Sequence, residues 1–299
     1  MELGGALRAA VTPLESGQFN ITDQEFQRFQ ELIERTAGIH LTAQKRQLLC
    51  SRLAPRLRAL KLTGFGGYWE FLQGDQSGDE LALLVNQITT NKTSFFREGH
   101  HFEALAQKIL LPFASGLARG EGRKLRIWSA ACSSGEEPWS IAMTLVERLP
   151  SLGSLDVKVL ATDIDTEMLA KASAGVYPLD RTEEMPRDQV ARHFLRGSGS
   201  SEGLVRVRDN LRGLVTYRPL NFVEHPWPVK AQFDAIFCRN VLIYFTAALQ
   251  RQVVDGLLAR LRPGGLLLLG HSESMLGMRP ELSCSGKTVF EKHLAGSPK

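Results

Sequence analysis

Residues 128–142 read Trp-Ser-Ala-Ala-Cys-Ser-Ser-Gly-Glu-Glu-Pro-Trp-Ser-Ile-Ala, and this stretch decides the fold. The apolar segment 125–130 leading into it is typical of a buried strand, and Pro138 suits the first turn of a helix. In open α/β sheets, cofactors bind at such turns between a strand and a helix. A second apolar segment, 157–162, runs into Asp163, and an acid at the tip of the second strand is placed to hold ribose hydroxyls. The two features together predict a cofactor that contains a nucleoside.

The residues of the turn narrow the choice of cofactor. A dinucleotide is normally held by several glycines at a helix N-terminus, whereas this turn has one, Gly135, followed by Glu136 and Glu137. Two carboxylates would repel a diphosphate but suit S-adenosylmethionine (SAM), which has positive charge and no phosphate. Acids in a first helical turn also complement the helix dipole, so the inference depends on Asp163 as well. A dehydrogenase is therefore disfavoured.

Composition describes an ordinary globular protein. The chain has 299 residues, of which 43% are hydrophobic and 23% charged, and this length suffices for one large or two ordinary domains. A net charge of +4 is too small to require nucleic acid. The four cysteines show no C-x-x-C spacing, so we expect no metal site, no disulfide framework and a cytoplasmic location. No segment is long and apolar enough to predict a signal peptide or membrane insertion.

The patterns divide the chain into four parts. We expect residues 1–20 to be poorly ordered, residues 21–90 to form a helical domain, residues 91–120 to form a linker and connecting helix, and residues 121–299 to form an α/β domain. Expected helices of the first domain begin at Thr22, which opens a capping box, and then cover about 42–62, 67–73 and 78–89. Expected strands are 125–130, 157–162, 214–219, 233–238, 265–270 and 287–292.

Alternation of these strands with helices predicts a mostly parallel sheet that is covered on both faces. No helix is apparent before the last strand, so that strand should return antiparallel. One interval interrupts the alternation: in residues 192–208 two apolar runs flank a Gly-Ser tip, which predicts a small antiparallel insert at about 190–213.

The expected helix 42–62 is basic. No acid lies between Glu34 and Glu70, and Lys45, Arg52 and Arg56 share one stripe of the helix. This predicts a dock for an acidic partner, and charge alone leaves both an acidic protein surface and nucleic acid open. Pro55 lies inside this helix and should kink or divide it.

Five motifs in consistent order resemble the CheR family, the bacterial chemotaxis protein-glutamate O-methyltransferases. They are Thr-x-Phe-Phe-Arg (93–97), Trp-Ser-Ala-Ala-x-Ser-x-Gly-Glu-Glu-Pro (128–138), Ala-Thr-Asp-Ile-Asp (161–165), Phe-Cys-Arg-Asn-Val-x-Ile-Tyr-Phe (237–245) and Gly-His-Ser-Glu (270–273). The resemblance implies an N-terminal helical domain and a class I SAM-dependent methyltransferase domain, Rossmann-like, with a small antiparallel β-subdomain. It also implies methylation of glutamate side chains on chemoreceptors, with S-adenosylhomocysteine as the other product.

The resemblance implies the roles of individual residues. Cofactor contacts are expected from Asn91, Thr93, Arg97, Glu137, Asp163, Asn221, Phe222, Arg239 and Asn240, and catalytic roles from Arg97 and Tyr244. The basic helix would contact acidic receptor helices, and the β-subdomain would take a receptor C-terminal peptide by strand addition. The enzyme would then be cytoplasmic and recruited to receptor arrays at the membrane.

A glutamate acceptor needs no general base, because a carboxylate with a pKa near ~4.3 is already ionised at neutral pH. Histidines 100 and 101 are accordingly expected to begin a helix with solvent or backbone partners. The alternative function on this fold is a nucleic-acid methyltransferase. The basic helix favours it, but the Asn/Asp-Pro-Pro-Tyr/Phe motif of amino-group methylation does not occur in the sequence.

Overall fold

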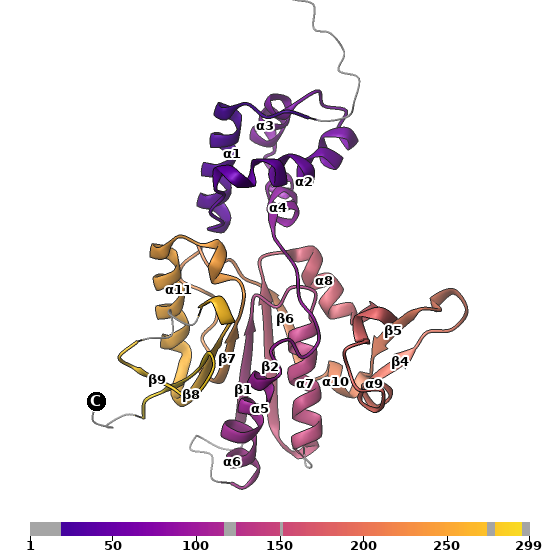
Figure 1. Ribbon diagram of the computed structural model, residues 1–299, viewed down its shortest axis with the longest axis vertical. Coiled ribbons are helices and arrows are strands. Elements are labelled where there is room, and N and C mark those ends of the chain that lie inside the picture. The colour runs from indigo at the N-terminus through magenta and orange to yellow at the C-terminus, as the bar shows by residue number, and fades with distance from the viewer. Residues whose placement is uncertain (1–18, 117–123, 150–151, 274–278, 295–299) are drawn as a thin grey trace, which may run out of the picture.

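The computed structural model describes residues 19–116, 124–149, 152–273 and 279–294. Figure 1 shows a group of helices above a central sheet, with a small second sheet projecting to one side. Most of the N-terminal segment that we expected to be poorly ordered lies outside the described residues. No helix within the described ranges is both long and apolar enough to cross a membrane.

Four helices make up the upper group. They are α1 (Asp23–Ala37), α2 (Arg46–Ala59), α3 (Phe65–Gly74) and α4 (Asp79–Ile88), and a short 3-10 helix, Ala43–Lys45, precedes α2. The expected capping box is present, with Thr22 and Glu25 each bonding the other's backbone. Helix α1 ends at Gly38, whose φ of 73° favours glycine, and an added Cβ there would clash with Leu249 of the lower part.

Helix α2 is continuous through Pro55. The proline therefore does not divide the helix, which was one of the two outcomes that the sequence predicted. Its apolar stripe is fully buried at Leu49, Leu53 and Leu57. Burial of a leucine side chain stabilises the fold by about 1.5–3 kcal/mol, so this stripe offsets the hydrogen bond that Pro55 cannot donate.

The central sheet has the order β6-β2-β1-β7-β8-β10-β9. Its strands are β1 (Lys124–Ala130), β2 (Asp156–Asp163), β6 (Val215–Pro219), β7 (Phe233–Cys238), β8 (Leu261–Leu269), β9 (Leu282–Cys284) and β10 (Val289–Lys292). The first five in this spatial order pair in parallel, and β10 pairs antiparallel with β8, as expected. The three-residue strand β9 was not expected, because so short a run carries no periodic signal.

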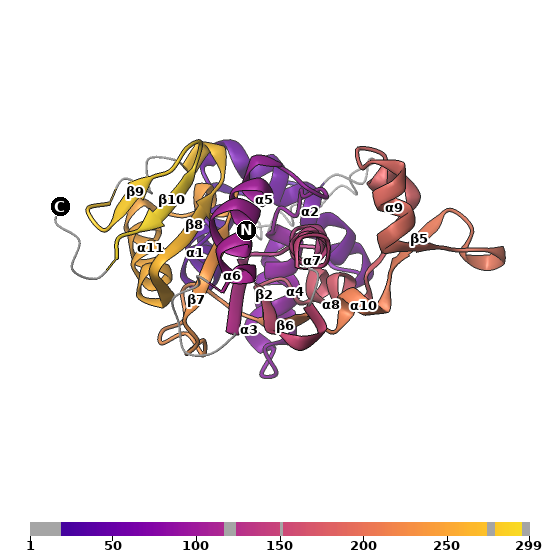
Figure 2. The same cartoon turned by 90° about the horizontal axis from the view of Figure 1, so that it is seen from below.

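Alternate residues of β1 enter two separate cores. Ile127 packs with α7 (Glu136–Arg148) and with the helix pair α5 (His100–Leu105) and α6 (Leu111–Ala114) on one face. Trp128 packs on the other face in a core that contains both α11 (Ala247–Arg260) and the helices α1 to α4. The view from below in Figure 2 shows α6 and α7 overlying the sheet. The upper helices are thus part of the same core as one face of the sheet.

The connecting helix expected within residues 91–120 is interrupted in its described part. A five-residue π-helical segment, Ala106–Leu110, separates α5 from α6. Pro112 lacks the amide hydrogen that a continuous α-helix would bond to the carbonyl of Lys108, and this accounts for a break near this point.

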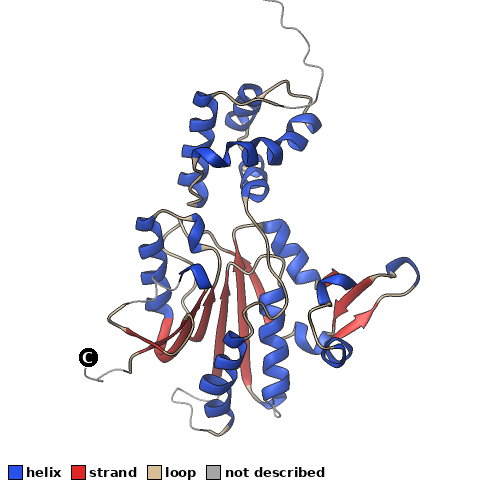
Figure 3. Ribbon diagram, viewed as in Figure 1, coloured by secondary structure: helices blue, strands red, loops and turns tan. Residues whose placement is uncertain are grey.

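The small sheet has the order β3-β5-β4, with strands β3 (Val176–Pro178), β4 (Phe194–Arg196) and β5 (Leu204–Val207). The hairpin β4–β5 is the one that the two apolar runs predicted. Strand β3 lies before the expected insert and follows α8 (Thr166–Ala174) almost directly. It was not predicted, because a strand of three residues carries no periodic signal. Helices α9 (Arg187–His193) and α10 (Asp209–Arg212) flank the hairpin, and Figure 3 shows the sheet standing apart from the central one.

Candidate active site

A cavity of about 280 Å³ lies where the carboxyl ends of β1, β2, β6 and β7 meet the upper helices. All ten residues that the sequence singled out for the site line it: Asn91, Thr93, Arg97, Glu137, Asp163, Asn221, Phe222, Arg239, Asn240 and Tyr244. The upper part adds Ala37, Ile39, Leu41, Lys45 and Leu48 to its wall. The cavity is therefore shared by the two main parts of the chain.

The turn after β1 is tightly wound around the end of β2. Ala131 and Ser133 both have positive φ, and the amides of Ala131 and Cys132 donate to the carbonyl of Thr162. Gly135 itself is not part of the cavity wall. An added Cβ would lie 2.6 Å from the side chain of Ala172, so packing against α8 demands this glycine.

Asp163 carries the buried carboxylate of the cavity. Its Oδ2 accepts from the Ser133 amide at 2.7 Å and its Oδ1 from the Asp165 amide at 2.9 Å. No arginine or lysine pairs with it among the described residues. Burial raises the pKa of Asp163 to about 6, against the lowering effect of its two amide donors. Further neutral donors, such as the hydroxyls of a ribose, would complete its hydrogen bonding, so the residue fits the predicted cofactor.

Glu137 lies on the cavity wall but is bound within the protein. Its Oε1 accepts from Ser129 at 2.7 Å, and its Oε2 is 3.0 Å from Nη1 of Arg239. We expected its charge to face a cationic cofactor, but Arg239 neutralises most of that charge. Its neighbour Glu136 is paired with Arg181 and takes no part in the cavity.

Arg239 is 7% exposed and connects the strand tip to the linker. Besides Glu137, its guanidinium donates to the backbone carbonyl of Arg97 and lies 3.4 Å from Glu98. The linker is also held at Phe96, whose amide donates to Ser140 of α7. The Arg97 side chain itself makes one hydrogen bond, to the carbonyl of Lys92 at 2.8 Å.

The start of the linker is anchored by Asn91. Its side-chain amide donates to the carboxylate of Asp165 at 2.7 Å, and its backbone carbonyl accepts from the hydroxyl of Ser133 at 3.2 Å. The carbonyl of Thr93 accepts from Arg181 at 2.7 Å. These bonds draw the linker over the turn that follows β1.

The far side of the cavity combines an amide with aromatic rings. Asn221 donates to the carbonyl of Thr36 at the end of α1, so its side-chain nitrogen joins the two parts of the chain. Phe222 packs on Phe245, with ring centroids 6.1 Å apart. The ammonium of Lys45 lies 5.3 Å from the centre of the Tyr244 ring, within the range of a cation–π contact.

Sequence reasoning assigned no role to Glu273, although it belongs to the Gly-His-Ser-Glu motif. It is 1% exposed and accepts backbone amides from Asn240, Leu242 and Gly270, each within 2.8 Å. Asn240 has a φ of 59°, so this carboxylate holds the backbone at the tip of β7 in a turn that non-glycine residues rarely adopt.

Two of the three expected docking residues are engaged inside the helical part. Arg52 donates to the carbonyls of Ile88 and Thr89 and thereby satisfies the last turn of α4. Arg56 forms an ion pair with Glu80, which is 4% exposed and also accepts from Tyr68. Of the three, Lys45 alone reaches the cavity.

The mostly parallel sheet with an antiparallel last strand, its small antiparallel second sheet and the cavity at the strand tips define a class I SAM-dependent methyltransferase. Two family models match consecutive parts of the chain. The model of the all-alpha domain of the CheR methyltransferases matches residues 24–89, and the model of the SAM-binding domain of the same family matches residues 91–290. The chain belongs to the CheR methyltransferase family.

Curated relatives match over most of their length. The chain is 46% identical to chemotaxis protein methyltransferase 2 of Pseudomonas aeruginosa, over 91% of this chain and 94% of that protein. It is 43% identical to the chemotaxis protein methyltransferase of Escherichia coli, over 90% of this chain and 91% of that protein. The Salmonella typhimurium chemotaxis protein methyltransferase is also 43% identical, over 90% of each chain.

Proposed function

We propose that this protein transfers the methyl group of SAM to glutamate side chains of chemotaxis receptors, giving a methyl ester and S-adenosylhomocysteine. One observation carries the proposal. The Asp163 carboxylate lines the same cavity as Lys45 and Arg97, and neither cation is ion-paired within the described ranges. Such a site offers an anion to a cationic nucleoside and cations to an acidic acceptor.

The chemistry requires little from the protein besides position. A carboxylate oxygen attacks the methyl carbon while the carbon–sulfur bond of the sulfonium breaks, so an anion and a cation become two neutral products. The acceptor is ionised without a base, and in-line alignment contributes roughly 7–11 kcal/mol towards lowering the barrier. We assign Arg97 to orienting the acceptor carboxylate or the carboxylate of the cofactor, and Tyr244 to the wall against which the acceptor lies.

The ribose is assigned to Asp163, and the adenine to the region of Asn221 and Phe222. Asn91, Thr93 and Asn240 complete the cofactor contacts. Glu137 and Arg239 act together in this assignment, as an ion pair that lines the cavity and fixes the linker.

The receptor is proposed to approach along α2, with Lys45 as the residue nearest the cavity. Strand β4 at the edge of the small sheet has unpaired backbone groups, so it is the proposed place for a receptor C-terminal peptide. Such an enzyme would work in the cytoplasm at receptor arrays.

A transfer assay with methyl-labelled SAM tests the proposal. Receptor-containing membranes, DNA and RNA are offered separately, and label that is released by mild base identifies a carboxyl methyl ester. Base-labile label on receptor alone is expected. Label on nucleic acid with none on receptor would overturn the proposal and favour the alternative on this fold. Receptors lacking their last residues show whether the peptide contact matters.

A further inference from the structure

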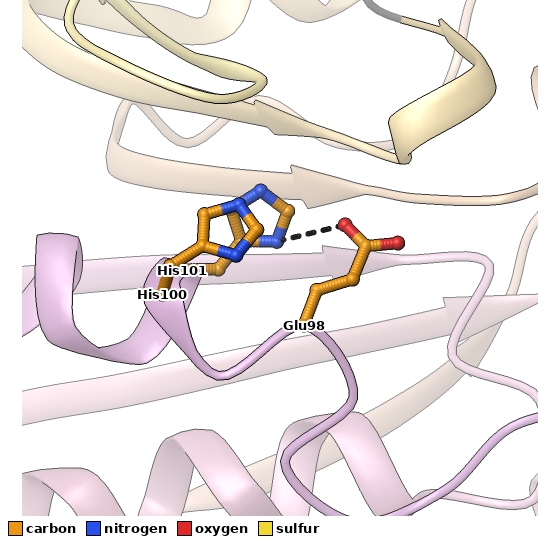
Figure 4. Close-up of side chains that lie close together, drawn as sticks. All are labelled: Glu98, His100 and His101. Carbon is orange, nitrogen blue, oxygen red and sulfur yellow. Dashed lines mark ion pairs between the residues drawn. The ribbon is translucent and has the colours of Figure 1, made fainter.

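Three side chains at the start of α5 form a cluster that the proposed methyl transfer does not use. Figure 4 shows Glu98, His100 and His101 side by side at one turn of the chain. One ligand atom of each residue lies within 4.8 Å of the others. We expected both histidines to meet solvent or backbone, but His101 is fully buried and its Nε2 lies 2.9 Å from Oγ1 of Thr288.

The tautomers of both histidines follow from their partners. The Thr288 hydroxyl donates to the carbonyl of Lys287, so it can only accept from His101, and the proton of that ring must be on Nε2. Nε2 of His100 lies 2.9 Å from the same carbonyl, which also accepts only. Each ring is thereby left with its lone pair on Nδ1.

The lone pair of His101 faces a second acceptor. Its Nδ1 lies 3.6 Å from Oε2 of Glu98, and both atoms are buried without a hydrogen-bond partner in the described structure. At 3.6 Å the two atoms are too far apart for a hydrogen bond through a proton on Nδ1, so the contact drawn in Figure 4 joins a lone pair to a carboxylate. Nη2 of Arg239 lies 3.4 Å from the same Oε2 without forming a hydrogen bond, so a cation between Nδ1 of His101 and Oε2 of Glu98 would satisfy both acceptors.

We propose that Glu98, His100 and His101 form a binding site for a divalent transition-metal ion of the zinc class. Metal–ligand distances of about 2.0–2.2 Å at a tetrahedral angle put two ligand atoms about 3.4 Å apart, close to the separation seen between His101 and Glu98. Both rings donate their second nitrogen to acceptors on the 287–288 segment, which is the usual arrangement behind metal-bound histidines.

Charge and access agree with this site. The two carboxylates of Glu98 and Glu137 surround one guanidinium, that of Arg239, and leave one net negative charge to attract a cation. His100 is exposed and gives an ion a path from solvent, while His101 closes the inner side. The cysteine spacing gave no sign of such a site, because its ligands are two adjacent histidines and an acid two residues before them. The inference does not depend on the proposed methyl transfer.

Isothermal titration calorimetry of zinc into the untagged, metal-free full chain tests the site. A second titration with Co²⁺ in place of zinc is monitored by the visible absorption spectrum. One ion per chain is expected, with the visible bands of a tetrahedral nitrogen–oxygen site. Glu98→Gln and His100→Ala should each weaken binding by about tenfold or more, equivalent to about 1.4 kcal/mol. His40→Ala is the matched control, because His40 forms an exposed pair with Glu34, and it should bind zinc like the parent.

His100 is exposed, so its variant should fold, and thermal melts verify this. Failure of the parent to bind one ion would overturn the site and leave a proton or a water between His101 and Glu98. Equal affinity of the parent, Glu98→Gln and His100→Ala would also overturn it.

Discussion

Asp163 is buried, and no cation among the described residues pairs with its carboxylate, which makes it the most informative single residue of the cavity. Its two amide donors fix the direction of its oxygens but leave each with a free lone pair. Arg97 differs, because a single backbone carbonyl holds its side chain and leaves most of its donors available.

Asp163→Asn should weaken the binding of S-adenosylhomocysteine by roughly 10–100-fold, the range for losing a hydrogen bond to a charged group. Isothermal titration calorimetry measures this directly. Asp180→Asn is the control, since Asp180 is exposed and outside the cavity, and its affinity should not change. Equal affinities of the two variants would remove Asp163 from the ribose site.

Binding of S-adenosylhomocysteine should weaken as the pH falls through about 6, because Asp163 becomes protonated there and loses the charge that attracts hydroxyl donors. The raised pKa has the opposite effect on the free protein. The folded state binds the proton more tightly than the unfolded state, so this residue lowers stability as the pH rises from the ordinary range of an aspartate to about 6. Calorimetry at about pH 5 and pH 7.5 measures the affinity for S-adenosylhomocysteine. In the Asp163→Asn variant the part of the affinity difference that is due to Asp163 should be absent.

Arg97→Ala should reduce kcat by about 100-fold, the scale observed when one preorganised donor is removed, while changing the free energy of unfolding by less than about 0.5 kcal/mol. Single-turnover methyl transfer and urea unfolding measure the two quantities. Unchanged kcat would exclude Arg97 from the reacting region.

At the scale of elements, α2 has two kinds of basic residue. Arg52 and Arg56 hold α4 in place, whereas Lys45 lies just before α2 and beside Tyr244. An effect of mutating one of these arginines on methylation would therefore combine docking with the stability of the helical part.

Arg56→Ala should destabilise the protein by about 3 kcal/mol, because it leaves the buried Glu80 carboxylate without its cation. Lys45→Ala should leave stability almost unchanged and reduce receptor methylation. Denaturant unfolding and the transfer assay, applied to both variants, separate the roles. A stable Arg56→Ala protein with poor methylation would restore Arg56 as a docking residue.

Elements were predictable where periodicity was long. The buried parallel strands were expected within a few residues, because continuous apolar runs bounded by turns specify them. The pair of Arg56 and Glu80 was not, since sequence does not show which charges meet across 24 positions. The contact between Gly135 and Ala172 was not predictable for a similar reason, because the sequence does not show how α8 packs.

At the scale of the whole molecule, the cavity and one core belong to both main parts. A backbone bridge between Ile39 and Phe245 and the bond from Asn221 to Thr36 join them. The ten site residues that the family resemblance implied all line one cavity, and the convergence of parallel strand tips explains this for those that follow β1, β2, β6 and β7. The contribution of Ile39, Leu41 and Leu48 to the wall was not predictable, because it depends on how the parts dock.

Because the cavity is shared, S-adenosylhomocysteine should stabilise both parts together. At about 100 times its dissociation constant a ligand adds about 2.7 kcal/mol, which corresponds to a shift in Tm of roughly 5 °C. Differential scanning calorimetry should show one transition that moves as a whole. Two transitions, of which only one responds, would contradict the shared core.

The core that joins Phe29 and Leu53 of the upper helices to Trp128 and Leu257 of the lower part has a consequence for protein engineering. The upper helices α1 to α4 cannot be exchanged between relatives as an independent unit. A chimera would need the matching face of the sheet and α11 from the same parent, because otherwise voids and steric overlaps would form in the core beside the shared cavity.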